Sequence, residues 1–192
     1  MKTNRTTSGI SWIEMHGLLA QLEKNEKFRD CLLIATGCYL GLRASDLLNL
    51  KWRDVYNKDE LELVEKKTNK LRHLTINPFL KDIIHRSFDN LSIKPGNPLE
   101  RYLFENRKGE KLSIQYVNRN LHKIFDEYRV KVKNGSTHTL RKTFGKRVWD
   151  MDGKSERALI YLSQIFNHSS THITRKYIGI VQEDISNIYL SL

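Results

Sequence analysis

Apolar side chains recur at helical spacing along most of the chain. The clearest early repeat has apolar residues three or four positions apart, at Phe28, Leu32, Ala35 and Tyr39. This spacing predicts a helix with one buried face, and Gly41 is expected to end it. The four residues Ser-Trp-Ile-Glu at 11–14 form a capping-box pattern, which predicts an earlier helix running to about residue 25. A short third helix is expected over 43–50.

The apolar period changes between residues 61 and 76. Leu61 and Leu63 alternate with polar residues, and Leu74 and Ile76 do so again after the polar stretch 67–70. Alternation with a period of two is typical of strands that have one buried face. The segment therefore predicts a β-hairpin with a basic, polar tip.

Helical spacing returns in the second half of the chain. The expected helices cover about 78–89, 113–129, 139–151, 155–166, 170–178 and 181–191. Their apolar faces include Val117, Leu121, Ile124 and Phe125 in one helix and Leu140, Phe144 and Val148 in another. The longest loop, 90–100, lies between segments too short to fold alone, so we expect one domain. The predicted fold class is α+β, mainly α, with a small antiparallel sheet.

Charge narrows the choice of partner. The chain of 192 residues has 33 Lys and Arg against 22 Asp and Glu, a formal net charge of +11. Such an excess favours a polyanionic partner, nucleic acid before an anionic membrane surface. No apolar run approaches the roughly 18 residues of a membrane span. Residues 1–10 lack the apolar segment of a secretory signal, so the expected location is the cytoplasm.

The two cysteines agree with that location. Cys31 and Cys38 lie seven residues apart in a predicted helix, which separates their Cα atoms by roughly 10 Å, too far for a disulfide. Two free buried thiols suit a reducing compartment. Neither the cysteines nor the seven histidines show the spacing of a zinc site, so we expect no metal.

Two basic stretches are candidates for phosphate contact. Arg43 directly follows a glycine turn and opens a predicted helix, where an anion could bind. Taken alone, it is better explained as a helix-start arginine paired with Asp46. The hairpin tip carries Lys66, Lys67, Lys70 and Arg72. These cations could reach a nucleic-acid groove, or they could form a solvated turn that protects the strand edges from aggregation.

Two further stretches add titratable groups. His138 and Arg141 are three residues apart, so on a helix they share a face and could clamp a phosphate. His168 lies at a predicted break between helices, nine residues before Tyr177. Arg175 and Lys176 precede that tyrosine, and cations there would favour its phenolate. Each residue also has an ordinary structural explanation, namely a helix-cap histidine, a surface arginine or a packed tyrosine.

Taken in order, the stretches TGCYLGLRASDL, KKTNKLR, HTLRKTF and IFNHSSTHITRKYIGI resemble the catalytic domain of tyrosine recombinases, the phage integrase family. The resemblance covers about residues 12–185. Lys142 replaces a common His of the family pattern, and Asp46 replaces Glu. Phe166-Asn167 stands in place of Leu-Gly, where Asn167 can still adopt a left-handed turn.

The resemblance implies a DNA breaking-rejoining fold and a set of catalytic residues: Arg43, Lys67, His138, Arg141, His168 and Tyr177. Tyr177 is the implied nucleophile, and cleavage through a 3′-phosphotyrosyl link needs no metal, ATP or other cofactor. The arginines would bind the nonbridging oxygens, and Lys67, with Lys66 and Lys70 as rivals, would protonate the leaving 5′ oxygen. The resemblance assigns proton removal from Tyr177 to His138 and phosphate orientation to His168.

The implied partner is double-stranded DNA, together with other recombinase protomers in a tetramer. Expected contacts with backbone phosphates are Lys66, Lys70, Arg72, Lys142, Lys146 and Arg147. Residues 1–10 are expected to form a basic linker or tail and 11–192 the catalytic domain. The family's N-terminal core-binding domain is missing from this sequence, so we expect a fragment of a recombinase from a phage or mobile element.

Other classes of protein remain open. A noncatalytic DNA-binding protein would share the fold, but it would not need Tyr177. A type IB topoisomerase-like enzyme would share the chemistry without needing contacts between protomers. The apolar tail could supply such contacts through Ile185, Ile188, Tyr189, Leu190 and Leu192. An RNA-binding or membrane-surface protein is disfavoured, because neither an RNA-reading motif nor a basic amphipathic helix is evident.

Overall fold

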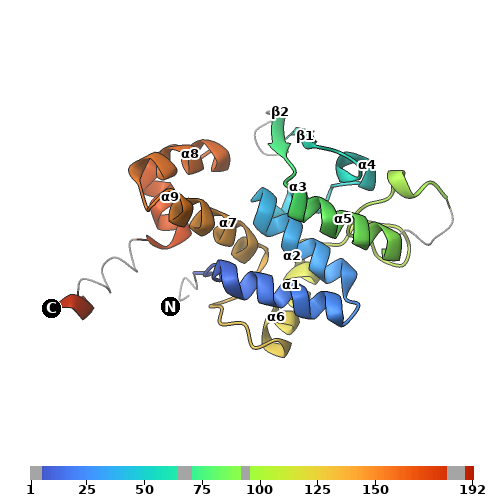
Figure 1. Cartoon of the computed structure of the whole chain (residues 1–192), viewed down its shortest axis with the longest axis horizontal. Coiled ribbons are helices and arrows are strands. Elements are labelled where there is room, and N and C mark those ends of the chain that lie inside the picture. The colour runs from blue at the N-terminus through green and yellow to red at the C-terminus, as the bar shows by residue number, and fades with distance from the viewer. Residues whose placement is uncertain (1–5, 65–70, 92–95, 181–188) are drawn as a thin grey trace.

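A computed structural model describes residues 6–64, 71–91, 96–180 and 189–192 (Figure 1). The elements follow in this order: α1 (Trp12–Lys24), α2 (Phe28–Leu40), α3 (Ala44–Leu47), α4 (Trp52–Val55), β1 (Glu60–Val64), β2 (Leu71–Thr75), α5 (Pro78–Leu91), the 3₁₀ turn η1 (Pro98–Glu100), α6 (Ile114–Glu127), α7 (Thr137–Met151), α8 (Glu156–Phe166) and α9 (Thr171–Ile178). The predicted class, mainly helical with a small antiparallel sheet, is confirmed.

The first two helices form as their sequences predict. The Ser11 side chain accepts a hydrogen bond from the Glu14 amide, and the Glu14 carboxylate accepts one from the Ser11 amide, which completes the capping box. Gly41 ends α2 in the left-handed conformation with φ 57°. Cys31 and Cys38 are free and buried, as expected. Burial raises the pKa of the Cys31 thiol to about 12 and raises that of Cys38 further.

The hairpin is confirmed over its strands. β1 and β2 pair antiparallel, with Leu61 opposite Leu74 and Val64 opposite Leu71. Leu61 is fully buried, and it anchors one face of the ribbon on the core. The tip at 65–70, which includes Lys66, Lys67 and Lys70, lies outside the described residues.

The predicted helix over 43–50 is too long. The structure has α3 at Ala44–Leu47 with Arg43 as its N-cap, and then the short α4, which the periodicity did not reveal. Tertiary pairing explains the early end. The Leu50 carbonyl accepts from the Leu103 amide at 2.9 Å, and Lys51 pairs with Tyr102 as an isolated bridge. The backbone around residue 50 must therefore be extended.

The later helices lie close to the predicted ranges. α7 begins two residues earlier than expected, because Ser136 caps it, so His138 lies inside the first helical turn. The predicted buried stripe on α7 is partly wrong: Leu140 is buried, whereas Phe144 and Val148 are half-buried. Both line a hollow that opens to the surface. The predicted helix over 181–191 falls mostly outside the described residues.

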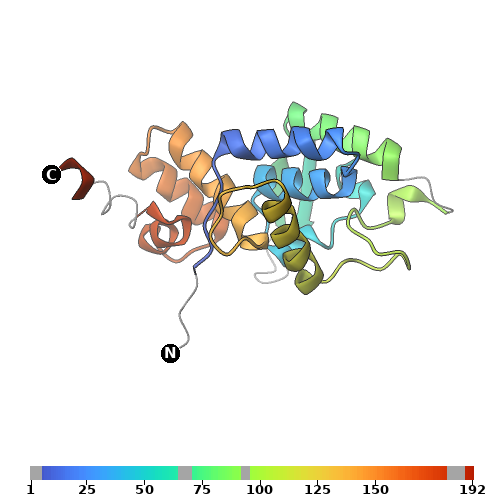
Figure 2. The same cartoon turned by 90° about the horizontal axis from the view of Figure 1, so that it is seen from below.

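Buried apolar side chains of the described residues gather in two clusters. The larger cluster is built from α1 to α6 and includes Leu140 of α7. The smaller cluster comprises Trp149, Ala158, Leu159, Leu162, Phe166, Ile178 and Ile180. α7 therefore contributes to both clusters, and Figures 1 and 2 show α7, α8 and α9 grouped at one end of the molecule. The candidate site lies where α7 passes from one cluster to the other.

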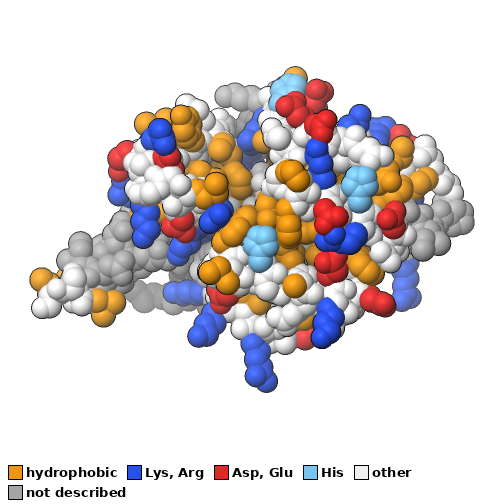
Figure 3. All heavy atoms as spheres, in the orientation of Figure 1, with side chains coloured by type: hydrophobic (Ala, Val, Ile, Leu, Met, Phe, Trp, Pro, Cys, Tyr) orange, Lys and Arg blue, Asp and Glu red, His pale blue; other side chains and the backbone are white. Residues whose placement is uncertain are grey.

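The face drawn in Figure 3 carries an apolar hollow between α1, α5 and α7. Trp12, Tyr39 and Phe79 line it, with Tyr39 and Phe79 stacked at a ring separation of 5.5 Å. The Arg147 guanidinium lies 5.2 Å from the Trp12 ring centre at its edge. In the described ranges, none of the helices combines the length and the apolar character that crossing a membrane requires.

Candidate active site

A pocket of about 360 Å³ collects most of the residues that the sequence singled out. Its walls come from the α2–α3 turn, the start of α6, the start of α7, the α8–α9 turn and α9 itself. The lining residues are Leu42, Arg43, Ala44, Ser45, Ile114, Thr137, His138, Arg141, Phe166, Asn167, His168 and Tyr177. Five of the six predicted catalytic residues are thus brought together, with Arg43 at least 95 residues from the other four in the sequence.

The α2–α3 turn places Arg43 at the pocket. Gly41 has φ 57°, and a Cβ at this position would come within 2.6 Å of the Phe144 ring. Glycine is therefore required both by the left-handed backbone and by the close approach of α7. Two residues later the chain enters α3 with Arg43 half-buried at the pocket wall.

The start of α7 places His138 and Arg141. Ser136 caps the helix by accepting from the His138 amide at 3.3 Å, and the Asn118 side chain accepts from the Thr137 amide at 2.9 Å. These bonds satisfy helix-end amides that would otherwise lack partners. His138 is exposed, whereas Arg141, one turn later, is 5% exposed.

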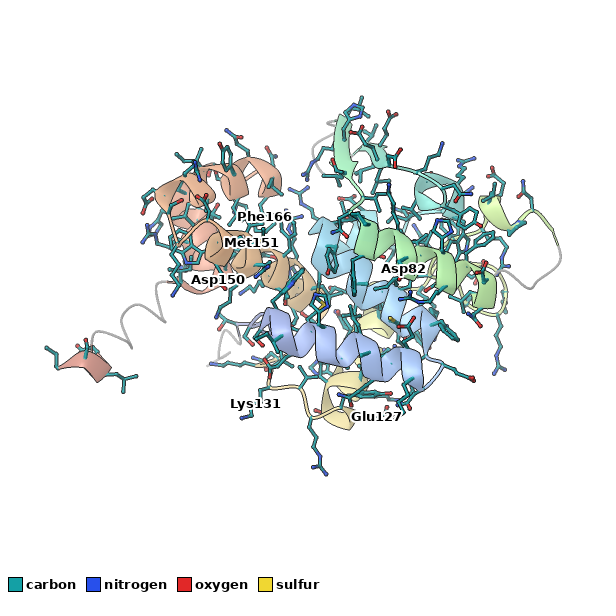
Figure 4. All side chains as sticks on the ribbon, viewed as in Figure 1. Asp82, Glu127, Lys131, Asp150, Met151 and Phe166 are labelled. Atoms are coloured by element: carbon teal, nitrogen blue, oxygen red, sulfur yellow. The ribbon has the colours of Figure 1, made fainter. Side chains whose placement is uncertain are left out.

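Backbone carbonyls hold both arginines. Arg43 Nη2 donates to the Phe166 carbonyl at 3.0 Å, and Arg141 Nη2 donates to the same oxygen at 3.2 Å. Arg141 Nη1 also donates to the Gly41 carbonyl at 2.5 Å. The Arg141 guanidinium lies 4.3 Å from the centre of the Phe166 ring, which Figure 4 labels beside α7. The C-terminal end of α8 carries partial negative charge, so it attracts cations.

The α8–α9 turn positions His168 and Tyr177. Asn167 ends α8 in the left-handed conformation, φ 52° and ψ 51°, as predicted from the residue type. His168 Nδ1 lies 2.9 Å from the Thr174 hydroxyl, a contact that orients the imidazole ring. The ring centres of His168 and Tyr177 are 5.3 Å apart, and His138 Nδ1 lies 3.5 Å from the Tyr177 hydroxyl.

Burial and neighbouring charge shift the two groups that could exchange a proton. Although His138 as a residue is exposed, desolvation of its ring at the pocket wall lowers its pKa, and the charges of Lys142 and Arg141 lower it further. The neutral imidazole is thereby favoured, which is the form that accepts a proton. Burial raises the pKa of Tyr177, while Arg141 and Arg43 act in the opposite direction. The Tyr177 phenol is therefore protonated at neutral pH.

The expectation that Arg175 and Lys176 promote the Tyr177 phenolate is wrong. Arg175 forms an ion pair with Glu156, and the Lys176 side chain is exposed. The cations that act on the phenol are Arg141 and Arg43, which reach it from distant parts of the sequence. Sequence neighbours on a helix point in different directions, so adjacency in the chain was a poor guide here.

The remaining predicted residues are placed as follows. Lys67, Lys66 and Lys70 lie outside the described residues. Arg72 Nη1 donates to the Ile165 carbonyl at 2.8 Å, which ties β2 to the end of α8. Lys142 Nζ donates to the Thr7 carbonyl at 2.6 Å, and Lys146 is half-buried on α7. Arg147 lines the apolar hollow rather than the pocket.

Two residues of the site were not assigned a role from sequence. Phe166 supplies the carbonyl that both arginines share and the ring against which Arg141 packs. Thr174 binds His168, and it occupies the Thr position of the family pattern, which was a usable signal. A backbone acceptor such as the Phe166 carbonyl leaves no trace in residue type. Within the described ranges, no group of three His, Cys, Asp or Glu side chains is arranged to hold a metal ion.

Comparison with known proteins identifies the class. The profile of the phage integrase family matches residues 13–183, so the chain belongs to this family. The predicted family and the predicted tyrosine recombinase fold are thereby confirmed. The chain is 33% identical over 167 residues to "Probable integrase/recombinase YoeC" of Bacillus subtilis, covering 86% of this chain and 85% of that protein.

Longer relatives match over part of their length. "Tyrosine recombinase XerH" of Campylobacter jejuni is 27% identical, over 80% of this chain and 42% of its own length. The chain thus spans less than half of that protein. Among solved structures, XerA recombinase superposes with a TM-score of 0.73 at 20% identity, covering 98% of this chain and 66% of XerA. XerH bound to its difH substrate superposes with a TM-score of 0.71 at 19% identity, covering 97% and 54%.

Proposed function

We propose that this chain is the catalytic domain of a site-specific DNA recombinase that cleaves and rejoins DNA through a 3′-phosphotyrosyl intermediate. The observation that carries the proposal is the meeting of Tyr177, His138 and two arginines in one pocket. Family membership supports the same reaction, and so does the XerH structure, which is a post-cleavage complex with its difH substrate.

Arg43 and Arg141 bind the scissile phosphate in this proposal. The transition state of phosphodiester cleavage gathers negative charge on the nonbridging oxygens. Two guanidinium groups fixed on one carbonyl can donate to those oxygens with little reorganisation. His168, oriented by Thr174, donates a further hydrogen bond to the phosphate.

Tyr177 is the nucleophile. Its phenolic oxygen forms a bond to phosphorus while the bond from phosphorus to the 5′ oxygen breaks, so no phosphate ester is lost overall. The phenolic proton passes to neutral His138, whose Nδ1 lies 3.5 Å away. A proton must also reach the leaving 5′ oxygen, and Lys67 is the proposed donor. Because the ester energy is retained in the phosphotyrosyl bond, rejoining needs no ATP.

The partners follow from the reaction. The proposed substrate is double-stranded DNA, which is consistent with the net charge of +11. The proposed place of action is the cytoplasm, because bacterial DNA lies in that compartment. Further protomers are proposed because strand exchange joins two duplexes. "Crystal structure of a lambda integrase dimer bound to a COC' core site" describes more than one copy on DNA for a structural neighbour.

The nucleophile can be tested with a nicked suicide duplex that traps a covalent adduct. Tyr177→Phe removes only the phenolic oxygen, so we expect the adduct to disappear while DNA binding changes little. Denaturing electrophoresis measures the adduct, and a gel shift measures binding. A noncatalytic DNA-binding protein would give no adduct with the unmodified chain on any recombination-site duplex.

Tyr161→Phe is the matched control. Tyr161 lies on α8, is 52% exposed and does not line the pocket. This variant should form the adduct as the unmodified chain does. An adduct that persists in Tyr177→Phe would contradict the assignment of the nucleophile. Loss of the adduct in Tyr161→Phe as well as in Tyr177→Phe would point to a general defect of these variants.

A further inference from the structure

Residues 6–10 form an N-terminal strap that lies along the start of α7. The Ser8 amide donates to the Lys133 carbonyl at 3.0 Å, and the Lys133 amide donates to the Ser8 hydroxyl at 2.9 Å. The Asn134 side chain donates to the Thr6 carbonyl at 3.1 Å. These bonds fasten the strap to the loop that leads into α7. Figure 2 shows the two segments side by side, the strap in blue and the loop in yellow.

The strap also binds α7 directly, next to the site residues. The Ile10 amide donates to the hydroxyl of Thr143, which is buried. Gly9 packs so closely that a Cβ there would lie 3.1 Å from the Thr143 amide nitrogen and 3.2 Å from the Lys142 carbonyl carbon. The position of the strap is therefore fixed relative to the turn of α7 that carries Arg141.

Lys142 connects the strap to the nucleophile. Its Nζ donates to the Thr7 carbonyl at 2.6 Å and lies 5.2 Å from the centre of the Tyr177 ring. A cation at this distance from an aromatic ring is attracted to its face. The carbonyl of the strap thus determines where the ammonium lies, and the ammonium contacts the ring that carries the reacting hydroxyl.

Given the proposed function, we propose that Lys142 is a positioning residue that couples the N-terminal strap to Tyr177 and His138. The strap holds the ammonium, and the ammonium holds the Tyr177 ring toward His138. The Lys142 charge also adds to the desolvation that favours the neutral, proton-accepting form of His138. Displacement of the strap would therefore slow cleavage by misplacing Tyr177, while the two arginines that bind the phosphate stay on the Phe166 carbonyl.

The charge environment of His138 supports this coupling. Arg141 and Lys142 act on it from its own helix, and the Tyr177 hydroxyl of α9 lies 3.5 Å from its Nδ1. Arg43 and His168 line the same pocket. Residues 6–10 carry no charged side chain. Desolvation lowers the pKa of His138 most, and the charges of Lys142 and Arg141 lower it further, so loss of the Lys142 charge should raise that pKa.

The first test is the pH profile of adduct formation on the suicide duplex. Lys142→Met keeps the apolar stem but removes the charge. Cleavage should fall about tenfold at neutral pH, because a misplaced nucleophile reacts slowly. The acid limb of the profile, below which protonated His138 cannot accept the phenolic proton, should move to higher pH because loss of the Lys142 charge raises the pKa of His138. Lys142→Arg keeps the positive charge, so the acid limb of its profile should lie at the same pH as in the unmodified chain. A merely structural role would lower the rate without moving the limb.

The second test is a double-mutant cycle with the strap. In Gly9→Ala the new Cβ would lie 3.1 Å from the Thr143 amide nitrogen, so the strap must shift slightly relative to α7 and Thr7 moves with it. Cleavage should then fall by about threefold to tenfold. In the Lys142→Met background the same change should have little further effect, because both act through one contact. Gly17→Ala is the matched control, since a Cβ on this exposed α1 residue meets nothing within 4 Å.

The outcomes separate this inference from the proposed function. If the unmodified chain forms no adduct, the proposed function fails. Two results with an active unmodified chain would refute the coupling and leave the proposed function standing. In the first, Lys142→Met does not move the acid limb of the pH profile. In the second, Gly9→Ala lowers cleavage as much in the Lys142→Met variant as it does alone.

Discussion

Neutral acceptors hold the arginines of the site. The Phe166 carbonyl accepts from both Arg43 and Arg141, and the Gly41 carbonyl accepts from Arg141. A carbonyl carries no net charge, so these bonds fix a guanidinium without cancelling its charge. Such fixed cations suit the developing charge of a phosphoryl transition state better than cations that must reorganise.

Replacement of Arg141 tests this arrangement. Arg141→Ala should slow adduct formation by about 10²-fold or more, the usual scale for one transition-state donor. Arg141→Lys should be nearly as slow as Arg141→Ala. A guanidinium donates from two nitrogens to the Gly41 and Phe166 carbonyls at once, and the single nitrogen of an ammonium cannot reproduce that planar arrangement. Single-turnover rates at saturating protein give the comparison.

Arg157→Lys is the matched control for the arginine substitution. Arg157 lies on α8, pairs with Asp152 and is exposed. Its replacement should leave the cleavage rate unchanged. A drop of less than a few-fold in Arg141→Ala would count against a role for this guanidinium on the phosphate.

At the scale of elements, the end of α8 organises the site. Its last carbonyls, at Ile165 and Phe166, accept from Arg72, Arg43 and Arg141. The left-handed Asn167 ends the helix so that these carbonyls point to the arginines instead of continuing the helical ladder. A single backbone turn therefore connects the hairpin, α3 and α7.

The turn can be tested through Asn167. Asn167→Ala should destabilise the fold by about 1 kcal/mol, because a Cβ is strained at φ 52° without the local bonding of Asn. Tm should then fall by about 2–4 °C. Asn167→Gly should keep Tm within about 1–2 °C of the unmodified chain, since glycine adopts this conformation freely.

Cleavage should follow the same order, with Asn167→Gly more active than Asn167→Ala, because the turn sets the Phe166 carbonyl. Thermal unfolding and adduct formation measure the two effects. If Asn167→Ala and Asn167→Gly had equal Tm and equal cleavage rates, the left-handed backbone at residue 167 would not be needed for the site.

At the scale of the whole molecule, the charge excess governs DNA binding. The net charge of +11 predicts affinity that arises mainly from counterion release. Log Kd should rise with log salt concentration at a slope of about 0.9 per phosphate contacted, with Kd on the order of 10⁻⁶ M or weaker near physiological salt. Gel-shift titrations across a salt series measure the slope.

Variants that remove one charge test how many phosphate contacts determine the salt dependence of Kd. Lys146→Gln should lower the slope by about 1 if Lys146 contacts a phosphate. Arg157→Gln should leave it unchanged, because Arg157 is already paired with Asp152. Nanomolar binding that ignores salt would contradict the electrostatic account of affinity.

Local features were predictable because neighbouring residues decide them. The capping box at Ser11 and Glu14, the left-handed Gly41 and Asn167, and the alternation around Leu61 and Leu74 all rest on short-range preferences. The early end of α3 was not predictable. It depends on backbone pairing between residues around 50 and those around 102, a contact that local periodicity does not encode.

The sequence by itself determined the capping box at Ser11, the helix ends at Gly41 and Asn167, the presence of the hairpin, the charge excess and the ordered motifs that carry the family resemblance. Tertiary structure alone decided what surrounds each reactive group. Arg43 reaches a carbonyl 123 residues away, and Lys142 meets Tyr177 and Thr7 from opposite ends of the chain. The pKa of Tyr177 rises rather than falls because burial outweighs the nearby cations. Burial and backbone acceptors belong to the packed molecule, so residue type could not reveal them.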